Sequence, residues 1–215
     1  MLYQTLLFLD AAAHTMAHPL VSRDEQPWDK NGNLKLTFSK QTVTVGTINL
    51  DDVIGKLYDA CFTTGLCQTN DITMDGQRYT ETSQRDIKLT LRPDGEYQTW
   101  IHNGLLDSLA AAVKKIAKCE DTTWYPPNVC NPNNVGPVGF CNTTPEKIKQ
   151  CEVPAFWGID YRAGEGAPSN IKTDLDVENT DSKICQDVLT GLSAVAGTVN
   201  GVAGGIFSLA CLTCT

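Results

Sequence analysis

Two hydrophobic periods alternate along the chain and predict strands and helices in mixed order. Apolar side chains at every second position predict a strand over residues 34–38, and Val43 and Val45 continue the pattern as a longer strand or a hairpin pair. Asn49 then offers a helix cap, with acidic residues behind it and apolar residues at helical spacing up to Cys61. We therefore expect a helix of about three turns here.

The same two patterns return further along the chain. Residues 87–91 alternate apolar with polar or basic side chains before Pro93-Asp94-Gly95, which predicts a half-buried strand that ends in a turn, with a hairpin partner from about Gln77. From Trp100 the spacing is helical again, and lysines gather toward the carboxyl end of this helix. Its apolar stripe consists of Ile101, Leu105, Leu109, Val113 and Ile116.

The middle of the chain shows no comparable period. Residues 120–170 contain seven prolines, which are incompatible with long regular elements, so we expect loops there that are ordered by disulfides. Residues 171–177 alternate again and predict a strand with one solvent-exposed face. This order of elements predicts an α+β fold: an antiparallel sheet with two helices on one face, a split βαβ-like sandwich.

The carboxyl-terminal segment, residues 181–215, has a different character. No charged side chain follows Asp187, and small residues recur every fourth position, which on a helix would form one face that another helix could approach closely. These small residues are Ser193, Gly197, Gly201 and Gly205. Three alternatives remain open: a buried Gly-rich helix or helical hairpin, a membrane-active helix, or a cleaved lipid-anchor signal.

Cysteine usage points to an oxidising compartment. The chain has nine cysteines, and the single C-x-x-C motif, at the carboxyl end, lacks the partner pair that a zinc site needs. We predict a disulfide framework, with a small Cys61–Cys67 loop as the one suggested pairing. The odd count leaves one cysteine that is either unpaired or joined to another molecule. The candidates are Cys61, Cys67, Cys119, Cys130, Cys141, Cys151, Cys185, Cys211 and Cys214.

The amino terminus supports export. A short apolar run followed by small residues predicts a signal peptide over residues 1–17, with signal-peptidase sites after Ala13 and after Ala17, of which the second sets this boundary. Residues 18–23 are expected to be a pro-segment that ends at Arg23, and residues 24–180 the disulfide-bonded domain. Asn142 begins an Asn-Thr-Thr glycosylation sequon in a region expected to be a surface loop.

Charge and candidate chemistry argue for binding rather than catalysis. The net charge of −8 disfavours a partnership with nucleic acid, and no metal, cofactor or catalytic constellation is predicted. His102, at the start of the second predicted helix, lies outside any nucleophile motif and is expected to be a surface or capping residue. Aromatic clusters at 124–127 and 156–161 are either packing anchors or a recognition surface.

The layout of the whole chain resembles that of fungal small secreted cysteine-rich proteins. The resemblance is carried by the short signal, the Leu-x-x-Arg site at Leu20 to Arg23 of the kind that kexin-type proteases cleave, the small α+β core and the many cysteines. That group includes plant-pathogen effectors and killer-toxin-like proteins. The resemblance implies an extracellular, non-enzymatic protein that binds a host or competitor target.

Three other possibilities are kept beside this prediction. Membrane contact through the carboxyl-terminal segment would make the protein membrane-active. The alternatives from other classes are a secreted hydrolase that uses carboxylates and a lipid-anchored structural protein of the cell surface.

Overall fold

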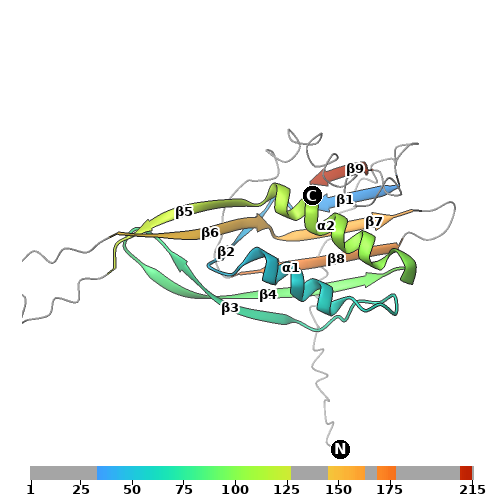
Figure 1. Ribbon diagram of the computed structural model, residues 1–215, viewed down its shortest axis with the longest axis horizontal. Helices are drawn as coiled ribbons and strands as arrows, with labels where there is room; N and C mark the ends of the chain where they lie inside the picture. Colours follow the sequence, from blue (N-terminus) through green and yellow to red (C-terminus); the bar gives the residue numbers. More distant parts are fainter. Residues whose placement is uncertain (1–32, 127–144, 163–168, 178–208, 215) are drawn as a thin grey trace, which may run out of the picture.

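The computed structural model describes residues 33–126, 145–162, 169–177 and 209–214. The elements in these ranges are drawn in Figure 1. In chain order they are β1 (Leu34–Phe38), β2 (Thr42–Gly46), α1 (Leu50–Ala60), β3 (Ile72–Tyr79), β4 (Gln84–Glu96), the 3-10 helix η1 (Thr99–Ile101), α2 (His102–Ile116), β5 (Lys118–Trp124), β6 (Glu146–Pro154), β7 (Phe156–Tyr161), β8 (Ser169–Asp176) and β9 (Leu209–Cys214).

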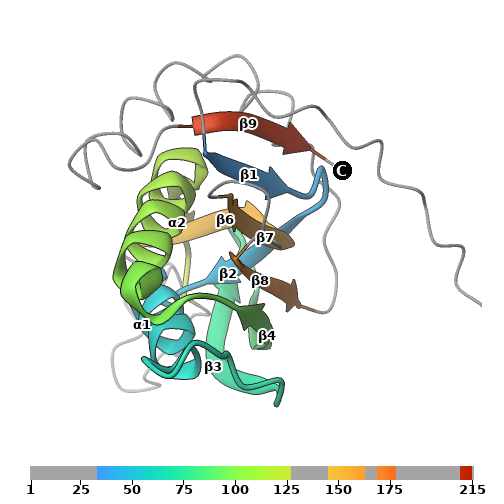
Figure 2. The same cartoon turned by 90° about the vertical axis from the view of Figure 1, so that its right-hand side faces the viewer.

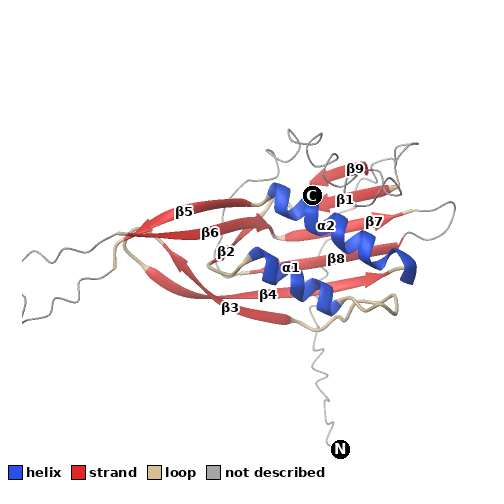
Figure 3. Ribbon diagram, viewed as in Figure 1, coloured by secondary structure: helices blue, strands red, loops and turns tan. Residues whose placement is uncertain are grey.

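The strands form two sheets, where the sequence pattern predicts one (Figure 3). The larger sheet has six strands in the order β3-β4-β8-β7-β1-β9, and the smaller has three in the order β2-β6-β5. All neighbouring strands are antiparallel except β1 and β9, which are parallel. The predicted strands at 34–38 and 43–45 exist, but they lie in different sheets and do not pair with each other. The α+β class is confirmed.

Both predicted helices are confirmed, and they cover the same face of the larger sheet (Figure 2). Asn49 caps α1, because its side-chain oxygen accepts a hydrogen bond from the backbone N–H of Asp51 at 3.0 Å. All five residues of the apolar stripe predicted for the second helix are buried. The helices also touch each other: the Tyr58 hydroxyl donates to Asp107, and Lys114 forms an ion pair with Asp51 at 2.6 Å.

The main core lies between these helices and the larger sheet. On β4 the odd-numbered residues from Leu89 onward are buried and the even-numbered ones are exposed or half-buried, which is the alternation expected of a sheet with one covered face. Trp157 of β7 is fully buried, and its indole N–H donates to the carbonyl of Pro154 at 2.7 Å. The aromatic cluster at 156–161 is therefore largely a packing anchor.

The opposite face of the larger sheet is polar, and its charges are paired across strands. Asp75 lies opposite Lys88, and Asp94 lies opposite Lys172. Arg92 lies 3.4 Å from both Asp71 and Asp176. Opposite charges on facing strands stabilise a solvated sheet surface modestly, so this face explains the acidic and basic positions that alternate with the core residues.

The smaller sheet joins the larger one at the end of β3. Gly46 closes β2 with a φ of +58°, and the next backbone N–H, that of Thr47, donates to the carbonyl of Gln77 at 2.9 Å. The Gln150 side chain bonds the backbone of Tyr79 from both sides, accepting from its N–H at 2.8 Å and donating to its carbonyl at 2.9 Å. One amide thus substitutes for a neighbouring strand.

The predicted turn at Pro93-Asp94-Gly95 is wrong, because β4 runs straight through it and pairs with β8 as far as Glu96. The carbonyl of Gly95 accepts from Cys67 N–H at 3.0 Å, on the side away from β8. Backbone groups two residues apart point the same way, so a Pro93 N–H would also point away from β8. β3 begins at Ile72, opposite Leu91, and therefore does not extend beside Pro93. Pro93 has no N–H to donate, and no hydrogen bond of the β3–β4 ladder is lost because of it.

The prediction of loops over residues 120–170 is also wrong for the described part of this range, while residues 127–144 and 163–168 lie outside the described residues. β5, β6 and β7 lie almost wholly within this range, and β5 and β6 form a seven-residue ladder from Lys118 opposite Glu152 to Trp124 opposite Glu146. The prolines bound these strands instead of preventing them: Pro126 follows β5, Pro145 precedes β6, and Pro154 is the last residue of β6.

The carboxyl-terminal segment is described only in part. For residues 209–214 the helical prediction is wrong, since they form β9 beside β1. The small residues Ser193, Gly197, Gly201 and Gly205 lie outside the described residues, as do Ala17, Arg23 and Asn142.

Candidate functional site

Two disulfides cross-link the described residues. Cys61 pairs with Cys67, as predicted, and Cys119 pairs with Cys151, for which the sequence suggested no partner. Cys119 and Cys151 lie directly opposite each other in the β5–β6 ladder. Cys130, Cys141 and Cys185 lie outside the described residues, and Cys211 and Cys214 belong to β9.

The Cys61–Cys67 disulfide closes a compact loop at the end of α1. Inside it the N–H of Phe62 donates to the carbonyl of Leu66 at 2.8 Å, and Gly65 has a φ of +100° that favours glycine. The loop is held against the β4–α2 connection: the Tyr97 hydroxyl donates to the Phe62 carbonyl at 2.6 Å, and the Tyr97 N–H donates to the Gly65 carbonyl at 2.9 Å. Burial raises the pKa of Tyr97 to about 12.

His102 belongs to this anchoring system. Its Nε2 lies 2.8 Å from the carbonyl oxygen of Cys61, and because a carbonyl can only accept, Nε2 carries the hydrogen of this bond. The imidazole also stacks on Tyr97, with ring centroids 5.5 Å apart. The histidine therefore joins the end of α1 to the start of α2.

Large apolar side chains are exposed around this loop. Leu66 is 54% exposed, Phe62 is 47% exposed, and Trp100 of η1 is 60% exposed. The indole N–H of Trp100 donates to Gln98 at 2.6 Å, and its ring meets the ring of Tyr161 edge-on at 5.8 Å. We call Phe62, Leu66 and Trp100 with their two backbone segments the aromatic end; these segments lie together on the right of Figure 1.

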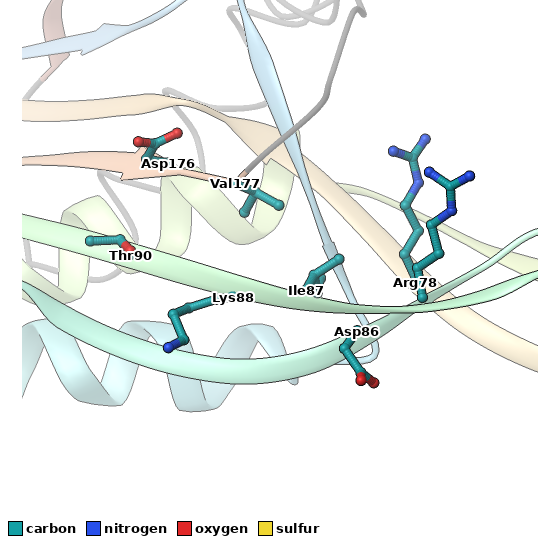
Figure 4. A pocket seen from close by; sticks show the side chains of 8 residues that line it. Arg78, Asp86, Ile87, Lys88, Thr90, Asp176 and Val177 are labelled. Atoms are coloured by element: carbon teal, nitrogen blue, oxygen red, sulfur yellow. The ribbon is translucent and has the colours of Figure 1, made fainter.

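A second feature is a groove beside β4 at the opposite end of the larger sheet. β8 ends at Asp176 opposite Thr90, so among the described strands none pairs with β4 on this side before Thr90, and this stretch of β4 borders a space of about 420 Å³. Arg78 and Arg85 face each other across β3 and β4 and both line it. Figure 4 shows Arg78 directed away from Asp86 and Lys88. The groove combines three basic with two acidic side chains.

A third feature is a smaller cavity of about 230 Å³ where the smaller sheet meets β3. Thr44, Glu152 and Lys118 form a row across β2, β6 and β5, because Glu152 lies opposite both of the others. Glu120 and Gln150, which face each other on β5 and β6, continue this polar floor. The remaining lining comes from Arg78, Tyr79, Thr80, Thr122 and Cys151.

None of these three features is predicted as a site from the sequence. The aromatic cluster predicted at 124–127 has two different environments. The ring of Trp124 packs edge-on against the ring of Tyr79, with centroids 5.0 Å apart, while Tyr125 is 49% exposed. The sequence predicts Trp100 as the start of a helix and Cys61–Cys67 as a small disulfide loop, but not that the two lie together. The hydrogen bonds of Tyr97 and His102 bring them to one end of the molecule, and no local sequence pattern encodes these long-range contacts.

Within the described ranges no group of three or more His, Cys, Asp or Glu side chains is placed to hold a metal ion. None of the helices described is long and apolar enough to cross a membrane. Comparisons of the chain with protein family models, with curated proteins and with solved structures find no match.

Proposed function

We propose that this protein is a secreted, non-enzymatic binding protein of the effector or toxin class, and that its aromatic end contacts a protein of a host or competitor. The observation that carries the proposal is the exposure of Trp100, Phe62 and Leu66 around one cross-linked loop. Tryptophan and other large apolar residues dominate the binding energy of protein interfaces, and grouped exposed apolar side chains mark interaction surfaces.

The rigidity of the aromatic end supports this function. A disulfide, the Tyr97 hydrogen bonds and the His102 bond fix the loop before any partner arrives. Binding through a pre-ordered surface loses less conformational entropy than binding through a loop that must be ordered on contact. The exposed apolar groups are thus presented in one fixed arrangement.

Charge near the aromatic end indicates what kind of partner surface would fit. Leu66 pairs with Glu96 in an isolated bridge, and both Glu96 and the nearby Asp94 are exposed. With a net charge of −8 for the whole chain, the approach of a basic surface is favoured over that of an acidic one. We expect a partner with an apolar pocket and a basic rim.

Binding of the fluorescently labelled, secreted protein to intact plant and yeast cells tests the proposal. Trp100→Ala should weaken the binding about thirtyfold, which corresponds to an interface residue worth about 2 kcal/mol. Tyr125→Ala is the matched control, because this tyrosine has comparable exposure but follows β5, away from the aromatic end. Binding should also weaken as salt is raised.

Two results would contradict the proposal. One is equal binding by the Trp100→Ala and wild-type proteins. The other is loss of binding in the Tyr125→Ala control alone, which would move the recognition surface to the other end of the molecule. Circular dichroism of both variants establishes that each is folded.

A further inference from the structure

We infer that the cavity between the smaller sheet and β3 binds one uncharged sugar ring, independently of the aromatic end. The first observation is the hydroxyl of Thr44. Thr44 is only 6% exposed, and its Oγ1 is buried without a hydrogen-bond partner in the described part of the chain. A buried hydroxyl that lacks a partner costs about 1–3 kcal/mol. Thr44 is among the residues that line the cavity, and rotation about its Cα–Cβ bond, which exchanges the positions of the hydroxyl and the methyl group, would turn the unpaired hydroxyl toward a ligand there.

The second observation is the balance of charge around the cavity. Arg78 and Lys118 supply two positive charges, and Glu120 and Glu152 supply two negative charges. An anion such as phosphate would be attracted by the first pair and repelled by the second. A neutral ligand with several hydroxyl groups suits both, because each hydroxyl donates to a carboxylate and accepts from a cation.

The third observation is size. At about 230 Å³ the cavity is smaller than the pockets of roughly 300–1,000 Å³ that hold drug-sized molecules, and its lining is polar where those are mostly apolar. A single polar ring fits this space better than an extended chain. Tyr79 lies on the lining and is braced by Trp124, so an aromatic side chain is available beside the polar floor.

Glu120 is the second residue that the proposal assigns to the ligand. It is exposed, and its side chain makes no hydrogen bond or ion pair with any described residue, whereas the Gln150 side chain bonds the Tyr79 backbone and Thr122. The ligand would therefore bond Thr44 at the buried end of the cavity and Glu120 at the open end. Both are side chains that the fold itself does not use.

Titration of the folded, secreted protein with glucose, galactose, mannose and N-acetylglucosamine, followed by protein-observed NMR and by thermal unfolding, tests the inference. At least one sugar should shift resonances around the cavity saturably and raise the Tm. Thr44→Val and Glu120→Gln should each weaken this binding about fivefold, which corresponds to one hydrogen bond worth about 1 kcal/mol. Thr73→Val and Glu96→Gln, at exposed positions outside the cavity, should leave it unchanged.

The unliganded Thr44→Val protein supplies a readout that a structural role would not give. If the hydroxyl serves only a ligand, its replacement by a methyl group of the same shape should leave the Tm unchanged or raise it. A lower Tm would show that the hydroxyl has a partner within the fold, such as a bound water, and would overturn the inference.

Two binding results would overturn it as well. Absence of binding by all four sugars is one. Saturable binding of inorganic phosphate that depends on the same two side chains is the other, since it would make the cavity an anion site. Neither result bears on Trp100, so the proposed function and this inference succeed or fail separately.

Discussion

A methyl group at Gly46 would lie 2.3 Å from the carbonyl oxygen of Gln77, where β2 meets the end of β3. The backbone there has a φ of +58°, a conformation that costs residues other than glycine about 1–2 kcal/mol. Two elements of different sheets are thus brought together by the absence of one side chain.

Gly46→Ala should therefore lower the free energy of unfolding by at least about 2 kcal/mol. Gly55→Ala is the matched control, since nothing lies within 4 Å of a Cβ at this position in α1. Alanine in a helix interior is favoured over glycine by about 1 kcal/mol, so the control should stabilise the protein. Urea denaturation measures both, and a stable Gly46→Ala protein would contradict the described junction.

The titration of the Tyr97 hydroxyl makes the stability of the protein depend on pH. Its pKa rises from 10.0 to about 12 in the folded protein because the side chain is buried. A raised tyrosine pKa means that folding favours the neutral phenol, so its contribution to stability is complete below pH 10 and is lost as pH rises through about 12.

We expect the free energy of unfolding to fall between about pH 10 and pH 12, and to fall less steeply in Tyr97→Phe. The variant also removes the hydroxyl that bonds the Phe62 carbonyl. Equilibrium denaturation across this range measures the slope. Equal slopes in the wild-type and Tyr97→Phe proteins would show that Tyr97 does not titrate as described.

At the scale of elements, the two disulfides close loops of different length. The sequence separation is 6 for Cys61 and Cys67 and 32 for Cys119 and Cys151. A longer closed loop restricts the unfolded chain more, and the chain-entropy relation gives about 2 kcal/mol for the first and about 4 kcal/mol for the second. The second also joins two strands with few apolar residues.

Replacement of both cysteines of a pair by alanine tests this order. Cys119→Ala with Cys151→Ala should lower the free energy of unfolding by about 4 kcal/mol, and Cys61→Ala with Cys67→Ala by about 2 kcal/mol. Guanidinium denaturation of the two double variants gives the comparison. A larger loss from the shorter loop would mean that the anchoring of the aromatic end contributes more than loop closure does.

The elements that the sequence predicts correctly are those whose pattern comes from contact with the main core. The strands at 34–38 and 171–177 and both helices bury one face against it, so their periods appear in the sequence. β5 has no such signal, because its seven residues Lys-Cys-Glu-Asp-Thr-Thr-Trp are exposed or half-buried. It is held by its ladder with β6 and by the Cys119–Cys151 disulfide.

The candidate sites could not be predicted for a related reason. The cavity takes Thr44 from β2, Glu120 from β5 and Arg78 from β3, and these meet only after the two sheets have joined. The aromatic end likewise depends on Tyr97 bonding a loop 35 residues earlier in the chain. Neither arrangement leaves a local period or motif.

At the scale of the whole molecule, the proposed contacts lie in different places. The aromatic end lies where the helices and loops meet at one end of the larger sheet, and the cavity lies where the smaller sheet joins β3 (Figure 1). The polar face of the larger sheet, with its paired charges, extends along the molecule between them. A protein partner and a sugar could therefore be bound at the same time without competing.

Each proposed contact lies beside one of the two disulfides. The Cys61–Cys67 disulfide fixes the aromatic end, and Cys151, on the cavity lining, is bonded to Cys119. Oxidised pairs at these four positions are the basis of the proposed extracellular function, because disulfides persist in oxidising compartments.

Disulfide mapping tests this claim most directly. The protein secreted by a eukaryotic host is alkylated without reduction, digested and analysed by mass spectrometry. The expected result is two linked peptide pairs, one joining Cys61 to Cys67 and the other joining Cys119 to Cys151. Alkylated thiols at these four positions would contradict it.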